Sequence, residues 1–209
     1  MFLAHWISCQ ARKFVVPLFA LFVLSGSANA AATMENMQAA FNGESNAHAR
    51  YLAFAQRADS EGYGEVATLF RAAARAEEIH AANHAVVIKG MGGVPQTRAE
   101  TLTVRSTREN LETAIQGESY ERDTMYPEFL KQARTDRNTR AIQSLNYAKT
   151  AEIEHAKLYT AALHDLEQLK GKSHTMIYVC PTCGFTVRET DFEKCPSCFT
   201  AKESFEAVS

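Results

Sequence analysis

The chain has 209 residues, of which 46% are hydrophobic and 22% charged, with only 5 Pro and 10 Gly. This composition is that of a soluble globular protein with room for one ordinary domain and a small one, and it excludes collagen-like, low-complexity and largely disordered chains. The formal net charge of −2 at pH 7 disfavours nucleic acid and anionic membranes as partners.

Residues 1–30 have the pattern of a secretory signal peptide. Arg12 and Lys13 form a basic region, Phe14–Leu24 is a short apolar run, and Ala28-Asn-Ala30 is a small-x-small cleavage pattern. The apolar run is too short for a permanent membrane span. We therefore expect cleavage after Ala30 and an exported, periplasmic protein without a membrane anchor. The loss of Arg12 and Lys13, with no acidic residue, changes the net charge from −2 to −4. The alternative is a cytoplasmic protein that starts at Met34.

The segment from Thr33 to about Leu169 is rich in Ala, Glu, Leu, Arg and Gln, and its apolar residues recur three and four apart. The pattern predicts helices at about 34–60, 65–89, 107–134 and 137–169, with a capping box at Ser106–Glu109 and a cap for the fourth helix at Thr135-Asp136. A short link, a long crossover over 91–105 and a second short link indicate an all-α, ferritin-like four-helix bundle, assigned to residues 31–170.

A polar linker at 170–173 precedes a second unit, residues 176–209, which includes the β-prone Ile177-Tyr-Val179. A piece of fewer than ~40 residues rarely folds on its own hydrophobic core. We therefore expect a small domain of short strands and loops that is held by a metal or by disulfides.

An internal repeat places one carboxylate on one helix and a Glu-x-x-His on the next. Gly43-Glu44-Ser45 is followed on the next helix by Glu77-Glu-Ile-His80, and Gly117-Glu118-Ser119 is followed, at nearly the same spacing, by Glu152-Ile-Glu-His155. Because residues i and i+3 share a helix face, the four helices can present four carboxylates and two imidazoles to one cavity. In the di-iron sites of bundle proteins, carboxylates bridge two metal ions and one imidazole binds each of them. The alternative is surface charge on long helices.

Three further side chains lie on the ligand faces. Glu121, three residues after Glu118, is a seventh candidate ligand, or else an exposed ion-pair partner. Tyr51 and Tyr126 are candidates for a supporting catalytic role, or else plain core residues. His84, four residues after His80, is expected behind the ligands or in the core.

Four cysteines form two C-x-x-C knuckles, Cys180-Pro-Thr-Cys183 and Cys195-Pro-Ser-Cys198, separated by positions 184–194. Each knuckle can place two sulfurs around one tetrahedral metal, and both iron and zinc fit four sulfurs. Two disulfides are the alternative in an exported protein.

At these residues the chain resembles the rubrerythrin family, over essentially everything after about residue 34. The stretches that carry the resemblance are Phe41–Tyr51, Glu77–His80, Gly117–Glu121, Met125–Pro127, Ala151–His155 and the rubredoxin-like tail through Lys202–Glu206. The departures are Phe199, which follows Cys198 where rubredoxin has Gly, and Ala201 in place of a Pro that is common in the family.

The resemblance implies two metal centres and a reaction. A di-iron site would be bound by Glu44, Glu77, His80, Glu118, Glu121, Glu152 and His155. Glu77 and Glu152 would bridge the irons, and His80 and Glu121 would exchange at one iron as the redox state changes. Tyr51 and Tyr126 match family tyrosines near the irons. Cys180, Cys183, Cys195 and Cys198 would hold one iron.

The implied activity is a peroxidase that reduces hydrogen peroxide to water in defence against oxidative stress. Its electrons would come from an unidentified donor through the one-iron domain. The implied assembly is a homodimer, with the one-iron centre of one subunit near the di-iron site of the other. The residues leave two other functions open. A ferroxidase or iron-binding bundle would leave the four cysteines without a role. A zinc ribbon on a helical scaffold for protein binding would leave the carboxylate–histidine repeat without a role.

Overall fold

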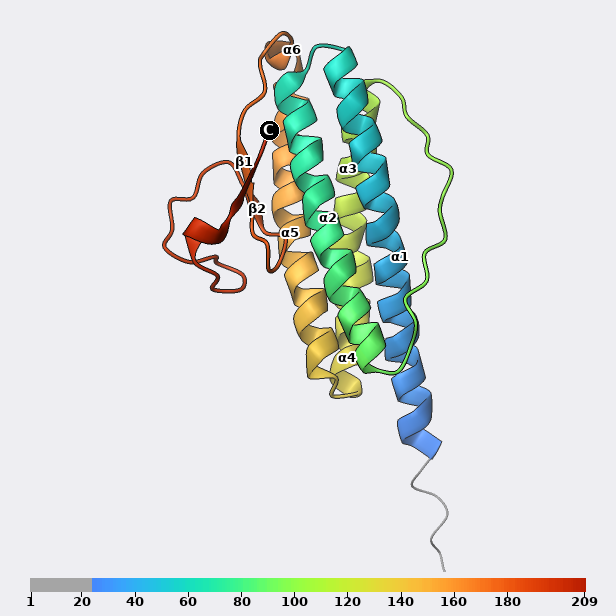
Figure 1. Ribbon diagram of the computed structural model, residues 1–209. Coiled ribbons are helices and arrows are strands. Elements are labelled where there is room, and N and C mark those ends of the chain that lie inside the picture. Colours follow the sequence, from blue (N-terminus) through green and yellow to red (C-terminus); the bar gives the residue numbers. More distant parts are fainter. Residues whose placement is uncertain (1–23) are drawn as a thin grey trace, which may run out of the picture.

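The computed structural model describes residues 24–209, with side chains from residue 31 onward. Four long helical stretches form the bundle that the sequence predicts (Figure 1). The helices are α1 (Leu24–Ser60), α2 (Gly64–Gly90), α3 (Thr107–Tyr120), α4 (Tyr126–Thr135), α5 (Thr139–His164) and the short α6 (Leu166–Leu169), and a π-helical turn, η1 (Glu121–Met125), joins α3 to α4. The predicted signal peptide lies mostly outside the described residues and stays a prediction. Within the described part of the chain, no helix is both long and apolar enough to cross a membrane.

Two expected helix starts differ from the structure. α1 already includes Leu24, the first residue that the structure describes, rather than starting near residue 34, because the alanine-rich segment before Thr33 is helical. The cap of α5 is Asn138, whose side chain accepts a hydrogen bond from the backbone of Ala141, so the predicted cap at Thr135-Asp136 is wrong. The capping box at Ser106 is confirmed: its side chain accepts from the Glu109 backbone while Glu109 reaches back to Ser106.

Two hydrophobic clusters fill the bundle, with the repeated carboxylates between them. One cluster is centred on the buried rings of Tyr51, Phe54, Phe70 and Tyr159. The other contains Tyr126 with aliphatic side chains of α1, α2, α4 and α5. Each large apolar side chain that is buried stabilises the fold by roughly 1.5–3 kcal/mol, which offsets the cost of enclosing a charged layer between the clusters.

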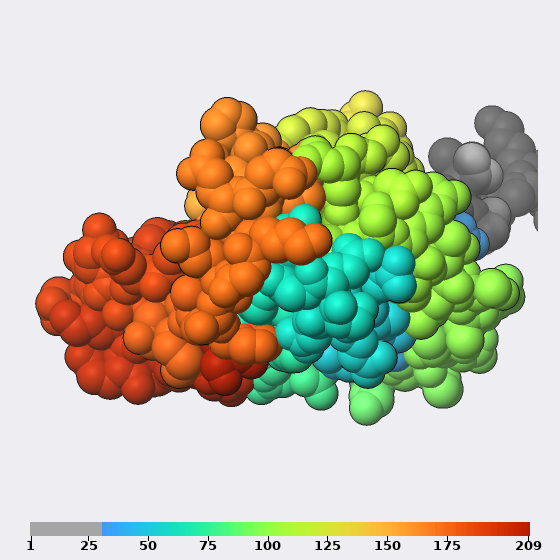
Figure 2. Space-filling view, turned by 90° about the horizontal axis from the view of Figure 1, so that it is seen from above, coloured from blue at the N-terminus to red at the C-terminus, as the bar shows by residue number. Residues whose placement is uncertain are grey.

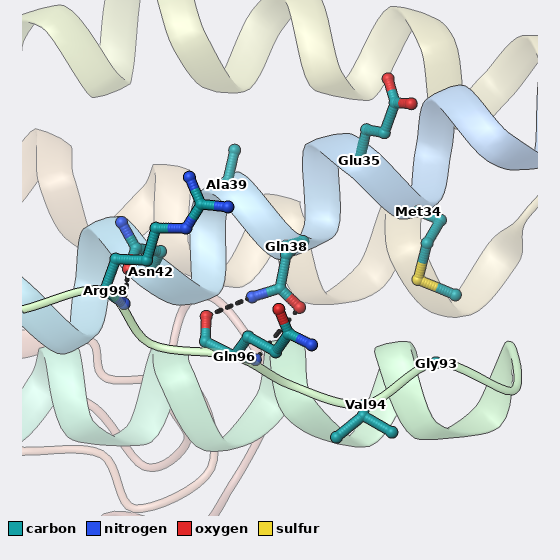
Figure 3. Close-up of a pocket in the computed structure, with 9 residues that line it drawn as sticks. All are labelled: Met34, Glu35, Gln38, Ala39, Asn42, Gly93, Val94, Gln96 and Arg98. Carbon is teal, nitrogen blue, oxygen red and sulfur yellow. Dashed lines mark hydrogen bonds between the residues drawn. The ribbon is translucent and has the colours of Figure 1, made fainter.

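The crossover between α2 and α3 runs along the outside of α1 (Figure 1). Three amide side chains of α1, four residues apart, bond backbone groups of the crossover that are two residues apart, and Figure 3 shows the first two of them, Gln38 and Asn42. The spacing matches because four helical residues rise about 6 Å and two extended residues about 6.6 Å. The pairs are Gln38 with Gln96, Asn42 with Arg98, and Asn46 with Arg98 and Glu100.

The C-terminal unit is a three-stranded antiparallel sheet in the order β2-β1-β3, built from β1 (Ile177–Val179), β2 (Thr186–Val187) and β3 (Glu206–Val208), with a 3-10 turn, η2 (Lys202–Ser204). The predicted strand at 177–179 is the central one. The unit packs against α2 and α5, on the side of the bundle away from the crossover (Figures 1 and 2). Arg75 of α2 holds Glu206 of β3 with two hydrogen bonds of 2.7 and 3.0 Å.

Candidate metal centres

The six carboxylates and imidazoles of the repeat converge inside the bundle. Each is at most 1% exposed. Their ligand atoms form two groups, and within each group all atoms lie within 4.8 Å of one another. One group is Glu44, Glu77, His80 and Glu152, and the other is Glu77, Glu118, Glu152 and His155.

Two carboxylates belong to both groups. Glu77 places Oε2 2.8 Å from Nδ1 of His80 and Oε1 3.3 Å from Nδ1 of His155. Glu152 does the converse, with Oε2 2.8 Å from Nδ1 of His155 and Oε1 3.2 Å from Nδ1 of His80. Each carboxylate therefore has one oxygen directed to each imidazole, which is the geometry of a bridge between two metal ions.

The donor set fits two cations. One oxygen each of Glu44, Glu77, Glu118 and Glu152 is buried without a hydrogen-bond partner in the described part of the chain. Burying such oxygens without a cation or a proton is costly. Burial, followed by the charges of Glu121 and Glu77, raises the pKa of Glu44 well above its usual range. Burial, followed by the charges of Glu77 and Glu118, likewise raises the pKa of Glu152. Protons on Glu44 and Glu152 therefore reduce the negative charge that metal ions would otherwise balance.

Both imidazoles are oriented by the C-terminal unit. Nε2 of His80 lies 3.1 Å from the backbone oxygen of Cys183, and Nε2 of His155 lies 3.1 Å from the hydroxyl of Thr186. That hydroxyl donates to the backbone oxygen of Gly184, so it accepts from His155. Nε2 of both rings therefore carries a hydrogen, which leaves Nδ1, directed into the carboxylate cluster, as the nitrogen that would bind a metal ion. The sequence motifs gave no sign of these long-range partners.

Glu121 lies outside the two ligand groups. It opens the π-helical turn η1, and its pKa is raised by burial and then by the charges of Glu152 and Glu118, so its carboxyl lies near the cluster. Its exchange with His80 stays a prediction.

Each tyrosine named from the sequence donates to a carboxylate of the cluster. The hydroxyl of Tyr51 donates to Oε1 of Glu118, and that of Tyr126 donates to Oε1 of Glu44. His84 lies behind Tyr126, fully buried, and burial lowers its pKa to about 3. Tyr159, to which no sequence motif pointed, packs edge to face against Tyr51 with ring centroids 5.6 Å apart. A signal for it was present, because it lies four residues after His155 on the same helix face.

The four cysteines converge in the C-terminal unit. Sγ of Cys180 is 3.4 Å from Sγ of Cys198, and Sγ of Cys183 is 3.6 Å from Sγ of Cys195. These distances are near the edge of a tetrahedron with metal–sulfur bonds of about 2.3 Å, and they are far from the ~2.05 Å of a disulfide. All four are free thiols, so the structure favours a metal over two disulfides. A hydrogen bond with Cys183 lowers the pKa of Cys180 to about 5, which favours the metal-binding thiolate.

The two knuckles have the same backbone turn but face different surroundings. The residue after each knuckle has a positive φ, +75° at Gly184 and +63° at Phe199. A Cβ at Gly184 would lie 2.3 Å from Nε2 of His80, so only glycine fits between the knuckle and the bundle. Phe199 takes the same strained conformation with 74% of its surface exposed.

Comparisons with known proteins agree with this geometry. The family model described as "Rubrerythrin" matches residues 35–163. Nigerythrin from Nitratidesulfovibrio vulgaris (strain Hildenborough) is 39% identical over 84% of this chain and 86% of its own length. Rubrerythrin-2 from Clostridium acetobutylicum is 35% identical over 85% of this chain and 97% of its own length.

Solved structures give the same picture. Nigerythrin in its fully reduced, all-ferrous state superposes with a TM-score of 0.76, at 39% identity over 84% of this chain and 86% of that one. A bacterioferritin from Desulfovibrio desulfuricans, 21% identical, superposes with a TM-score of 0.66 over 72% of this chain and 93% of its own, which supports the fold of the bundle. The fold and the two metal-binding clusters are therefore those of a ferritin-like bundle with a rubredoxin-like domain.

Proposed function

Because the chain belongs to the rubrerythrin family, we propose that it is a peroxidase that reduces hydrogen peroxide to water at a di-iron site, with electrons entering through the iron of the four-cysteine domain. The reaction consumes two electrons and two protons for each peroxide, breaks the O–O bond and forms two water molecules. The all-ferrous state named for nigerythrin supports iron, rather than zinc, as the metal of such a site.

One contact carries the proposal. The ring of His80 has Nδ1 in the carboxylate cluster, 2.8 Å from Glu77, and Nε2 on the backbone oxygen of Cys183, 3.1 Å away. A single side chain thus joins a ligand of one centre to a ligand of the other. Neither a ferroxidase nor a zinc ribbon requires that connection.

The residues of the chain have separate tasks in this reaction. Iron held by the carboxylate cluster would supply electrons to peroxide, and iron held by the four cysteines would supply one-electron transfer. Glu77 and Glu152 hold the two positions at a fixed separation, and His80 and His155 are held by Cys183 and Thr186. The tyrosine hydroxyls hold protons at Glu44 and Glu118. The two hydrophobic clusters exclude bulk water on either side.

The test uses the full-length, iron-loaded protein. It is reduced without oxygen and mixed with one equivalent of hydrogen peroxide per di-iron site, while the visible and Mössbauer spectra of both centres are followed. We expect the di-iron site to be oxidised within one turnover. If peroxide leaves the reduced irons unchanged, or if the purified protein holds only zinc, the proposal is wrong.

A matched pair of variants assigns the reaction to the carboxylate cluster. Glu77→Ala removes a bridging carboxylate and should abolish the reaction with peroxide while the absorbance of the sulfur-bound iron remains. Glu78→Ala is the control, because Glu78 is exposed and, among the described residues, forms an ion pair with Arg75 alone. Equal loss of activity in both variants would contradict the assignment.

Export and assembly are part of the same proposal. Thr33 is 1% exposed, and its hydroxyl donates to Asp136. A chain cleaved after Ala30 keeps this bond, whereas one that starts at Met34 loses it, so the bond favours a chain that includes Thr33 over a start at Met34. The N-terminal residue of the protein isolated from cells is the test: Ala31 agrees with export, and Met34 contradicts it.

For the proposed homodimer, light scattering should give twice the mass of the chain.

A further inference from the structure

A chain of hydrogen bonds connects the surface of the bundle to the ligand Glu44. Oγ of Ser144 on α5 lies 2.7 Å from Nδ1 of His84 on α2. Nε2 of His84 lies 3.3 Å from the hydroxyl of Tyr126, and that hydroxyl donates to Glu44. Three helical segments thus contribute one side chain each to an unbroken path that ends at the metal cluster.

The donors of this path all point the same way. Tyr126 has a single hydroxyl proton, which it gives to Glu44, so Nε2–H of His84 must donate to the Tyr126 oxygen. A neutral imidazole then has a lone pair on Nδ1, which accepts from the hydroxyl of Ser144. Every hydrogen is therefore placed to move one step inward, toward the cluster.

The outer end of the path reaches solvent. Ser144 lines a surface pocket of about 230 Å³ between α2 and α5, together with Asn83, Val86, Val87, Arg140, Gln143 and Tyr147. The pocket is large enough for several water molecules. Water there can return a proton to Ser144 after one has moved inward.

Among the residues that the structure describes, the other half of the bundle shows no such path. Tyr51 donates to Glu118 as Tyr126 does to Glu44, but the ring of Tyr51 is enclosed by Phe54, Phe70 and Tyr159. The hydroxyl of Tyr159 has no hydrogen-bond partner among the residues from 24 onward that the structure covers. The near two-fold repeat is thus asymmetric: hydrogen bonds connect Tyr126 to a surface pocket, whereas Tyr51 is enclosed by aromatic rings.

We infer that Ser144, His84 and Tyr126 form a proton relay that feeds the di-iron site from this pocket. The inference rests on the proposed function, because reducing one peroxide to two waters consumes two protons at a buried site. As a proton leaves Tyr126 for Glu44, Tyr126 takes one from Nε2 of His84, Nδ1 takes one from Ser144, and pocket water restores Ser144. The two electrons come from the reduced metal site. His84 and Ser144 act through Tyr126, so they are positioning residues rather than catalytic ones.

The decisive variant is Ser144→Ala, which cuts the path at the end farthest from the metal ligands. Alanine suits a helix interior, so the fold should be kept. Ser144→Thr restores a hydroxyl and should restore the relay. Thr160→Ala is the control, because Thr160 lies on the same helix and, within the described residues, its hydroxyl bonds only the backbone oxygen of Ala156.

The first readout is the rate at which peroxide oxidises the reduced di-iron site, measured in single turnover in H2O and in D2O. We expect Ser144→Ala to slow this step about tenfold, which is less than the ~10²–10⁴-fold contribution of a proton donor at the reacting atoms because Ser144 acts through His84 and Tyr126. Its solvent isotope effect should also change. Ser144→Thr and Thr160→Ala should keep the unaltered chain's rate and isotope effect. An unchanged rate and isotope effect in Ser144→Ala would overturn the relay.

The second readout does not depend on peroxidase activity. In the zinc-loaded, full-length protein with ¹⁵N-labelled histidine, NMR measures how fast the ring N–H of His84 exchanges with water. Ser144→Ala should slow that exchange several-fold, and an equal exchange rate would count against the relay. The two readouts separate the hypotheses: if peroxide never oxidises the unaltered chain, the proposed function fails, while the exchange rate still decides whether the path carries protons.

Discussion

Gly184→Ala is expected to separate the two metal centres without destroying either. Its Cβ would lie 2.3 Å from Nε2 of His80, whereas ordinary contacts begin near 3.5 Å, so the knuckle must move away by about 1 Å. The 3.1 Å bond between His80 and Cys183 then lengthens beyond hydrogen-bonding range, leaving a buried imidazole N–H unsatisfied at a cost of about 1–3 kcal/mol. Holding alanine at φ +75° adds roughly 1–2 kcal/mol.

A loss of about 2 kcal/mol in docking lowers the docked population up to roughly 30-fold. In a stopped-flow experiment, peroxide should oxidise the di-iron site of Gly184→Ala at nearly the unaltered rate, whereas the sulfur-bound iron should follow at least tenfold more slowly. Gly92→Ala is the control, because it has a similar φ of +83° and nothing within 4 Å of the added Cβ. Oxidation of the sulfur-bound iron at the same rate in both variants would refute the coupling through His80.

Three further outcomes are expected. In the metal-free protein, burial and neighbouring carboxylates raise the pKa of Glu44, while the charges of Glu77 and Glu118 outweigh burial and raise the pKa of His155. The folded state therefore holds protons that the unfolded state has released, so the free energy of unfolding in urea should fall between pH 6.5 and 8.5. A rise over this range would contradict the reasoning. Tyr159→Phe removes a buried hydroxyl that lacks a hydrogen-bond partner in the described chain. The free energy of unfolding of the metal-free protein should therefore rise by about 1 kcal/mol, seen as a higher thermal midpoint. A lower midpoint would show that the hydroxyl has a hydrogen-bond partner. Phe199→Gly relieves backbone strain at an exposed site and should make the cysteine domain at least as resistant to chelators as before, with faster metal loss as the contrary result.

The π-helical turn shows how a local signal can be present and still be missed. The sequence predicts one helix over 107–134, yet the structure has the turn η1 at Glu121–Met125 between α3 and α4. Pro127 lies just after it, and a proline in a helix interior removes one N–H and crowds the carbonyl four residues earlier, here that of Asp123. The wider turn accommodates that loss, as π-turns do near functional sites. The motif Met125-Tyr-Pro127 therefore contained the reason for the turn.

The ligands themselves could be found from the sequence because their spacing reports helix geometry directly. Glu77 and His80 share a helix face by periodicity alone, and two C-x-x-C knuckles define a sulfur site without knowledge of the fold. The contacts of His80 with Cys183 and of His84 with Ser144 join segments 103 and 60 residues apart. Such pairs depend on how the small domain docks and on how α5 packs against α2, and no local pattern encodes either.

The order of oxidation after a single addition of peroxide tests the central claim most directly. With both centres reduced, the di-iron site should be oxidised first, at a rate proportional to peroxide concentration. The sulfur-bound iron should follow at a rate that depends on neither peroxide nor protein concentration if, as proposed, its electron passes across the contact between Cys183 and His80. Oxidation of the sulfur-bound iron in proportion to peroxide, or its failure to be oxidised at all, would contradict an electron path from the cysteines to the di-iron site.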